Sequence, residues 1–360
     1  MTAPAVITGV GLVTPLGGTP QQTWDALLAG RAIVDHARID GLAAGNRAGE
    51  LALTAARQAI AQSGWSALNL GDHRSGLFVG TSKGPIEDWL TSGPQPEGMG
   101  QIAAFLAANL QMGCGPRLTL SAACASGLHA LIRAAMALHA GEAERALVVA
   151  VEAAVHPLFL ASFKRLGVLA PEGHGCRPFD QNRRGFLMSE AAAAVCLQPA
   201  DSADASPLAR LGRFAIGGDA THLTATDPDA PTLRRSLQQV IDGRGVDFVH
   251  AHGTGTLLND PAELSAIESC IPPTVGCPLV YSHKAALGHS QGAAGLVSVV
   301  LNCLCHRDSV VPPNVNTTQP LPTRAVRISR EAQRAPIRRS LALASGFGGP
   351  IAVVALDSVR

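Results

Sequence analysis

Cys124 lies where a cysteine could act as a nucleophile. It belongs to the segment SAACASGLHA, residues 121–130, between the strand-like residues 118–120 and a run of small residues typical of a tight first helical turn. The positive end of a helix dipole lowers the pKa of a nearby thiol and favours the reactive thiolate. We therefore expect Cys124 to be the most strongly activated of the eight cysteines. A small cysteine packed in the core would fit the same sequence.

Two histidines follow a second short apolar segment. The sequence HAHGTGT begins at His250, directly after Val246–Val249, and its glycines and threonines predict a loop at the end of a strand. His250 and His252 are two residues apart, so on a strand their side chains would point the same way. A zinc pair is one interpretation. No third ligand stands nearby at metal-binding spacing, so we expect no metal site.

A glycine-rich segment supplies a third imidazole and a lysine. HKAALGHSQGAAG, residues 283–295, places Lys284 and His289 ahead of a helix of small residues. Taken alone this pattern is weak, because close packing of a glycine-rich helix explains it as well as catalysis does. Its value as a functional motif depends on the other two segments.

The composition disfavours several function classes. The 360 residues carry a formal net charge of +1 and 15% charged residues, so no nucleic-acid-binding surface is indicated. No apolar run reaches the roughly 18 to 20 residues that a membrane span needs. The N-terminus lacks the basic start of a signal peptide, and the cysteines form no disulfide pattern. We expect a cytoplasmic protein whose partners are small molecules or other proteins.

The elements that must position these residues alternate between strands and helices. Outside the motifs, the clearest segments are a strand at Ala5–Thr8, turns over 9–18, a helix over 20–29, a helix over 50–63 and a strand at Arg145–Glu152. Gly30 and Gly64 supply the stops of the two helices. The last strand is apolar enough to be buried on both faces. Such alternation indicates an α/β fold.

An internal repeat divides the chain. Leu118–Leu138 has the pattern of a strand, a polar turn and a small-residue helix, and Leu279–Leu304 has the same pattern. Two similar halves, residues 1–204 and 205–360, would bring the helix starts at Cys124 and His289 close to one shared axis. We expect the site to assemble there.

Together the three motifs resemble the β-ketoacyl-[acyl-carrier-protein] synthase family, and in particular its elongating members with one cysteine and two histidines. Further matches are ITGVGLVTPLG near the start, RPFDQNRRGF over residues 177–186 and SGFGG over residues 345–349. The resemblance implies the thiolase fold, an α/β fold in which two similar βαβαβαββ halves stack as five layers (αβαβα). It also implies an acyltransferase that condenses an acyl thioester with malonyl-acyl carrier protein, with loss of CO₂, in fatty-acid, polyketide or polyene biosynthesis.

The resemblance assigns roles to individual residues. Cys124 would accept the acyl group from the phosphopantetheine of an acyl carrier protein, and His252 and His289 would stabilise the enolate that CO₂ loss leaves. The backbone N–H groups of Cys124 and Phe347 would form the oxyanion hole, and Phe347 would gate the acyl pocket. The supporting residues implied are Lys284 and Glu263 for electrostatics, Thr254 and Thr256 for the pantetheine arm, and Gly348 for substrate binding and loop freedom. The family binds no cofactor or metal of its own.

The chain departs from the family's pattern at supporting positions. Ser298 stands where the family often has a glutamate after GAAG. The segment from Trp89 to Ile102 is shorter than the family's usual stretch near the acyl pocket. These changes favour a specialised pathway, such as polyketide or aryl polyene synthesis, over housekeeping fatty-acid synthesis. The alternative is a non-condensing subunit that resembles a chain-length factor, which the retained Cys124 disfavours.

The same resemblance predicts two kinds of protein partner. An acyl carrier protein is acidic, and it would dock on basic residues near the pocket, for which Lys164, Arg165 and Arg133 are the candidates. Thiolase-fold synthases pair through a sheet edge, so we expect a homodimer or a heterodimer with a related synthase or chain-length factor.

Overall fold

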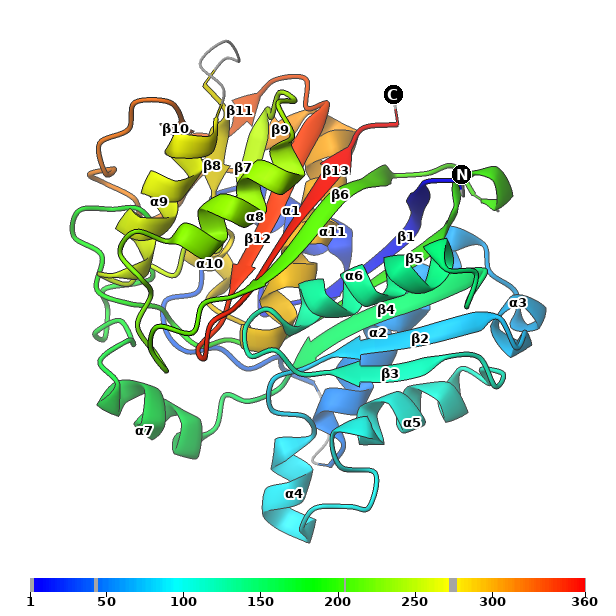
Figure 1. Ribbon diagram of the computed structural model, residues 1–360. Coiled ribbons are helices and arrows are strands. Elements are labelled where there is room, and N and C mark those ends of the chain that lie inside the picture. The colour runs from blue at the N-terminus through cyan, green and yellow to red at the C-terminus, as the bar shows by residue number, and fades with distance from the viewer. Residues whose placement is uncertain (1–2, 42–44, 204, 272–276, 360) are drawn as a thin grey trace.

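The computed structural model describes residues 3–41, 45–203, 205–271 and 277–359 (Figure 1). Its strands are β1 (Ala5–Val13), β2 (Ser75–Gly80), β3 (Arg117–Leu120), β4 (Arg145–Glu152), β5 (Ala191–Pro199), β6 (Ala209–Gly218), β7 (Phe248–His250), β8 (Leu279–Tyr281), β9 (Val310–Val311), β10 (Arg327–Ile328), β11 (Gln333–Arg334), β12 (Arg339–Ser345) and β13 (Pro350–Asp357). In this part of the chain, every helix is too short or too polar to span a bilayer.

The strands form two arms with the same order. One arm runs β3-β2-β4-β5-β1, and the other runs β8-β7-β12-β13-β6 with β10 added at its edge. In each arm the first three strands are parallel, and the last two are antiparallel to their neighbours. The arms meet through two residue pairs between β1 and β6. Because both halves follow the order βαβαβαββ, the predicted internal repeat is confirmed in the topology.

Helices cover both faces of each arm. They are α1 (Pro20–Leu28), α2 (Arg47–Ser63), α3 (Ala67–Gly71), α4 (Ile86–Ser92), α5 (Gln101–Asn109), α6 (Ser126–His139), α7 (Pro157–Arg165), α8 (Pro231–Ile241), α9 (Asn259–Cys270), α10 (Lys284–Leu287) and α11 (Ala294–Asp308), with 3₁₀ turns at Gly98–Gly100, Ala200–Ser202 and Gln291–Ala293. The largest apolar cluster joins α6 and α11 to both arms, which makes them the middle layer. Separate clusters pack α2 and α5 on one outer face, and α8 and α9 on the other. The thiolase fold with five layers is therefore confirmed.

Most local predictions hold, with one clear correction. α1 begins after the Thr19 cap, α2 ends at Gly64 with φ +73°, and β4 has the predicted bounds. The turns predicted from residue 9 onward are wrong as far as Val13, because β1 continues through this stretch. Its glycines serve packing: a Cβ on Gly11 would lie 1.8 Å from the Ala55 carbonyl oxygen of α2. The short residues let α2 lie directly on the strand.

The middle layer positions the site. α6 and α11 each begin close to a motif, since Cys124 precedes α6 by two residues and His289 precedes the Gln291–Ala293 turn that leads into α11. Gly127 of α6 lies against α11, where an added Cβ would be 3.0 Å from the Leu296 amide nitrogen. The two helix starts are therefore neighbours, as the repeat predicts. The predicted division after residue 204 falls on a residue outside the described ranges.

Candidate active site

A strained turn presents Cys124. β3 ends at Leu120, and Ala123 then adopts φ +47°, a left-handed conformation that costs a residue with a Cβ about 1–2 kcal/mol. The buried Ser126 side chain holds the turn closed. Its Oγ accepts a hydrogen bond from the Ala122 amide at 2.9 Å and donates one to the Ala123 carbonyl at 2.6 Å. Backbone strain of this kind is typical of functional sites.

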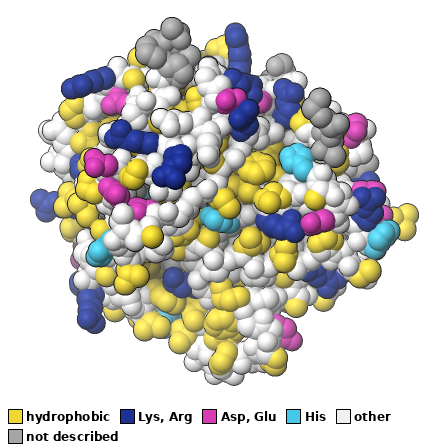
Figure 2. Space-filling model, in the orientation of Figure 1, with side chains coloured by type: hydrophobic (Ala, Val, Ile, Leu, Met, Phe, Trp, Pro, Cys, Tyr) yellow, Lys and Arg dark blue, Asp and Glu magenta, His cyan; other side chains and the backbone are white. Residues whose placement is uncertain are grey.

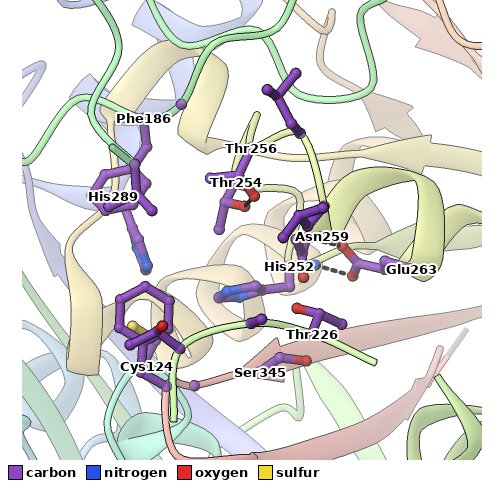
Figure 3. Close-up of a pocket in the computed structure, with 18 of the residues that line it drawn as sticks. Cys124, Phe186, Thr226, His252, Thr254, Thr256, Asn259, Glu263, His289 and Ser345 are labelled. Carbon is purple, nitrogen blue, oxygen red and sulfur yellow. Dashed lines mark hydrogen bonds between the residues drawn. The ribbon is translucent and has the colours of Figure 1, made fainter. Parts of the chain in front are cut away.

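Residues from both halves line a single cavity of about 780 Å³ around this turn. Cys124 comes from the first half, and His252, His289 and Phe347 come from the second. Figure 3 shows the His252 and His289 imidazoles pointing toward Cys124 from different loops. The site residues predicted from three separate motifs therefore lie together.

The Cys124 thiol is not the activated group that the sequence predicts. Burial raises its pKa to about 11, which outweighs the lowering by the positive charges of Lys83 and Lys284. The buried Glu152 carboxylate also acts to raise it. The expected thiolate is wrong for the resting enzyme, because desolvation disfavours the charged form. Cys124 is a neutral thiol at neutral pH.

His289 is held as a neutral imidazole with a known proton position. Its Nδ1 accepts a hydrogen bond from the Gln291 amide at 3.1 Å. Burial, and then the charge of Lys284, lower the pKa of His289 well below its usual value. A neutral imidazole that accepts at Nδ1 carries its proton on Nε2. The ring packs edge-on against Phe186 with centroids 5.0 Å apart. Since Nδ1 is already an acceptor, the Nε2–H group is the hydrogen-bond donor that the ring offers to the cavity.

His252 is fixed through its backbone from two sides. Its amide donates to Glu263 Oε1 at 2.6 Å, and its carbonyl accepts a hydrogen bond from Lys284 Nζ. Burial, Lys284 and His289 lower the pKa of the ring well below its usual value. The ring lies edge-on to His289 at a centroid distance of 5.5 Å. Lys284 and Glu263 thus hold the two peptide groups that flank the His252 Cα, and in this way they set the position of the imidazole.

Burial also shifts the two ionisable groups that hold His252. It lowers the pKa of Lys284 to about 8 and raises the pKa of Glu263 to about 7. The Glu263 carboxylate also accepts from the Gly253 amide at 2.8 Å. No carboxylate lies within ion-pair distance of Lys284 in the described residues. Each charge nevertheless opposes the effect of burial on the pKa of the other group, so Lys284 and Glu263 interact electrostatically as well as through the His252 backbone.

Thr254 and Thr256 lie side by side on the cavity wall. Their hydroxyls are 2.9 Å apart, and both side chains are visible above His252 in Figure 3. Asp260 fixes the loop by accepting from the Thr254 and Gly255 amides at 3.1 Å. Arg183, which sequence reasoning missed, donates to the Thr256 carbonyl at 3.0 Å. The two threonine hydroxyls thus form a polar patch on the cavity wall, and their role in binding a pantetheine arm stays a prediction.

The Gly346–Gly349 loop brings a second backbone amide to the nucleophile. A Cβ on Gly346 would lie 3.0 Å from the Cys124 amide nitrogen, so only glycine permits this approach. The Cys124 and Phe347 amides donate no hydrogen bond to another described residue. The role of these two amides as an oxyanion hole stays a prediction. The Phe347 ring packs against Phe163 at 6.2 Å, and Gly348 turns the chain with φ +83°.

His250 does not share the orientation of His252. β7 ends at His250, and its ring lies in the middle layer, bonded through Nε2 to His283 Nδ1 at 2.9 Å and through Nδ1 to Asn302 Oδ1 at 2.7 Å. The expectation that both histidines point the same way is wrong, because the strand ends between them. Ser298 lies 3.4 Å from His283 Nδ1, within this buried polar cluster.

Several site residues carried no signal in one sequence. Glu152 is fully buried and accepts from the Lys83 amide at 3.1 Å and the Gly292 amide at 3.0 Å, which ties the nucleophile side to the His289 loop. Ser126 and Arg183 likewise act on backbone atoms. Ser126 and Arg183 lie within quoted motifs, whereas the role of Glu152 depends only on contacts between distant segments.

Comparison with protein families decides the identity. The family described as β-ketoacyl synthase, N-terminal domain, matches residues 41–203, and β-ketoacyl synthase, C-terminal domain, matches residues 208–318. The chain belongs to the β-ketoacyl synthase family. It is a condensing enzyme of the acyltransferase class, of the kind that serves fatty-acid and polyketide synthesis. The resemblance drawn from its motifs is confirmed.

Individual relatives span the whole chain. A 3-oxoacyl-[acyl-carrier-protein] synthase 2 of Coxiella burnetii is 28% identical over 406 aligned positions, 98% of each chain. A β-ketoacyl synthase of Burkholderia phymatum is 25% identical, with a TM-score of 0.90 over 99% of this chain and all of that one. The ishigamide ketosynthase/chain length factor is 27% identical, with a TM-score of 0.87 over all of both chains.

Proposed function

We propose that this synthase elongates an acyl chain held on Cys124 with a malonyl unit delivered by an acyl carrier protein. The observation that carries the proposal is the convergence of Cys124, two neutral imidazoles and two unpaired backbone amides in one cavity. In the first step the Cys124 sulfur attacks the carrier's thioester. The two amides stabilise the oxyanion, and the proton of Cys124 leaves with the carrier thiol.

The second step uses the histidines. Loss of CO₂ from the malonyl thioester leaves an enolate, whose oxygen binds N–H donors such as His289 Nε2–H. The enolate carbon attacks the acyl carbonyl on Cys124, and the released thiolate takes up one proton. Neutral imidazoles suit this role, since each can donate without first losing a charge. The proposal needs no metal or bound cofactor, because the pantetheine arm arrives with the carrier protein.

The carrier protein would dock beside α7. Lys164 and Arg165 end this helix and are exposed, and the neighbouring Phe163 and Leu166 line the cavity. Figure 2 shows lysine and arginine side chains scattered over the visible face, so docking would depend on a few of them. Arg133 is the weakest of the three candidates, because its side chain already pairs with Glu142 at 2.7 Å. We also propose that the synthase works in the cytoplasm, as expected from its sequence.

A second thiolase-fold subunit would pair along β3. This strand ends its arm, and Leu118 on it is 37% exposed. Met136 of α6, which packs near the same strand, is 48% exposed. An open edge with apolar side chains favours pairing with a partner edge. Both a homodimer and a heterodimer with a related synthase or chain-length factor fit this edge.

Cys124 separates the synthase from the chain-length-factor alternative. A subunit that only shapes the pocket needs no strained turn, no paired amides and no thiol at the start of α6. For this reason we favour a catalytic role. The departures from the family's pattern at supporting positions, such as Ser298, favour a specialised pathway such as polyketide or aryl polyene synthesis.

The test is intact-mass analysis with a panel of acyl carrier proteins. The synthase should gain an acyl group that peptide mapping places on Cys124, and it should then release β-ketoacyl carrier protein when malonyl carrier protein is added. Cys124→Ser is the control for the site of acylation. Failure of every acyl donor to modify Cys124 would support the non-condensing subunit instead.

A further inference from the structure

Gln291 is a buried polar side chain without a partner in the cavity wall. It is 2% exposed and lines the same cavity as Cys124 and His289. Neither its Oε1 nor its Nε2 has a hydrogen-bond partner among the described residues. An unpaired buried amide is unfavourable, and native structures leave few of them. This residue therefore needs an explanation that the catalytic roles above do not supply.

The backbone holds Gln291 at this place against its own preference. Its φ is +44°, in the left-handed region that residues with a Cβ disfavour, and its amide donates to His289 Nδ1 at 3.1 Å. The next residue, Gly292, is tied by its amide to Glu152 Oε2 at 3.0 Å. Strain that the surroundings maintain is typical of sites under functional constraint. Gln291 is thus fixed one turn from the proton donor of His289.

Part of the same cavity is lined by an apolar cluster. Phe163, Val168, Leu169 and Phe186 line the cavity and pack together in one cluster. A hydrocarbon chain would pack against these four side chains but would leave the Gln291 side-chain amide without a hydrogen bond. Polar groups placed in a mostly apolar ligand site fix the orientation of the ligand by pairing with its matching atoms. The match for an amide N–H is an oxygen carried on the acyl chain.

We propose that Gln291 determines acyl specificity by binding the ketone oxygen of a β-keto acyl group on Cys124. The inference rests on the proposed function and narrows its substrate class to oxygen-bearing, polyketide-like chains. The thioester oxygen itself belongs to the two backbone amides, so the next oxygen along the chain is the one left for Gln291. Nε2–H donates to that ketone.

Acetoacetyl and butyryl thioesters test the proposal, since they differ chiefly at this oxygen. The measured step is acyl transfer: the Cys124 S–C bond forms, the donor's C–S bond breaks, and the Cys124 proton moves to the departing thiol. Rates of acylation by both groups on the same acyl carrier protein are read by intact mass. The quantity that matters is the acetoacetyl-to-butyryl rate ratio, which cancels general losses of activity.

Gln291→Met should lower this ratio about tenfold, equivalent to about 1.4 kcal/mol. Gln291→Glu keeps the size but removes the N–H donor, and it should lower the ratio as well. Gln111→Met is the matched control, because Gln111 also has positive φ, +52°, but is exposed and outside the cavity lining. Thermal unfolding checks that each variant is folded.

The outcomes separate this inference from the proposed function. An unchanged ratio in both Gln291 variants would overturn the specificity role. The side-chain amide would then hydrogen-bond to an ordered water molecule instead of the acyl chain. A ratio that falls equally in Gln111→Met would overturn it too. If the unmodified synthase accepts neither acyl group, nor any other, the proposed function fails instead. A fall confined to the Gln291 variants supports the inference.

Discussion

The charge of Lys83 should be measurable at the nucleophile. Lys83 follows β2, whose Gly80 lies against the start of α6, where an added Cβ would be 2.7 Å from the Ser126 carbonyl oxygen. Among the charges that lower the pKa of Cys124, that of Lys83 has the larger effect and that of Lys284 the smaller. The sequence contains three lysines against 25 arginines, and two of the three act on this thiol. Lys83→Met removes one charge and keeps the length of the side chain.

The size of the effect follows from the thiol's pKa of about 11. At pH 8 about one molecule in a thousand carries the thiolate, and this fraction rises tenfold with each pH unit. Two unit charges within about 10 Å interact by about 1–2 kcal/mol at an effective dielectric constant of about 20. Removing Lys83 should therefore raise the thiol pKa by about one unit and slow alkylation at pH 8 about tenfold.

The assay is iodoacetamide labelling of Cys124 from pH 7 to 10, read by peptide mass. The exposed Cys114 and Cys277 are changed to serine first, because they would react faster than the less accessible Cys124 thiol. Lys164→Met is the matched control, since Lys164 is exposed and has no part in shifting the Cys124 pKa. Lys83→Arg should restore most of the rate.

Two results would refute this reasoning. A labelling rate that levels off below pH 9 in the parent protein would mean that the thiol ionises easily despite its burial. Equal pH profiles for Lys83→Met and Lys164→Met would mean that Lys83 does not act on the sulfur.

Three further changes test the rest of the site. His289→Ala should still be acylated on Cys124 but should release CO₂ from malonyl carrier protein about 100-fold more slowly, measured with labelled malonyl; full CO₂ release would contradict the donor role. CO₂ release by the parent enzyme should fall above about pH 8, where Lys284 loses its proton, and Lys284→Met should lack this decline. Ser126→Ala removes both hydrogen bonds of the nucleophile turn and should lower the free energy of unfolding by about 1–3 kcal/mol, measured by urea denaturation.

The elements with local signals could be predicted from sequence. Thr19 caps α1 and Gly64 ends α2, because caps and left-handed stops depend on one or two residues. The extent of β1 could not be predicted. Its glycines look like turn residues, and only the position of α2 across the strand explains why they are there. The same limit applies to His250. The orientation of its side chain depends on where β7 ends and on a hydrogen bond to Asn302 of α11.

The identities of the reacting groups were easier to predict than their ionisation. The motifs name Cys124, His252 and His289 because nucleophiles and donors must be particular residue types. The pKa of Cys124 is set instead by how far the turn is buried, and a helix-start argument has no information about burial. Glu152 and Gln291 were missed for a related reason. The importance of Glu152 comes from contacts with residues 69 and 140 positions away, and that of Gln291 from its lack of hydrogen-bond partners among the described residues.

Burial moves the thiol and the imidazoles in opposite directions, and this explains how one pocket performs both steps. It raises the pKa of Cys124 to about 11 and lowers that of both histidines well below the usual value, so the proton stays on sulfur. No thiolate–imidazolium pair forms at rest, unlike in enzymes where histidine activates the cysteine. His289 keeps its Nε2–H available for the enolate because it never has to accept the cysteine proton. That proton must then leave with the departing carrier thiol, so acylation should speed up steadily with pH, whereas decarboxylation should not.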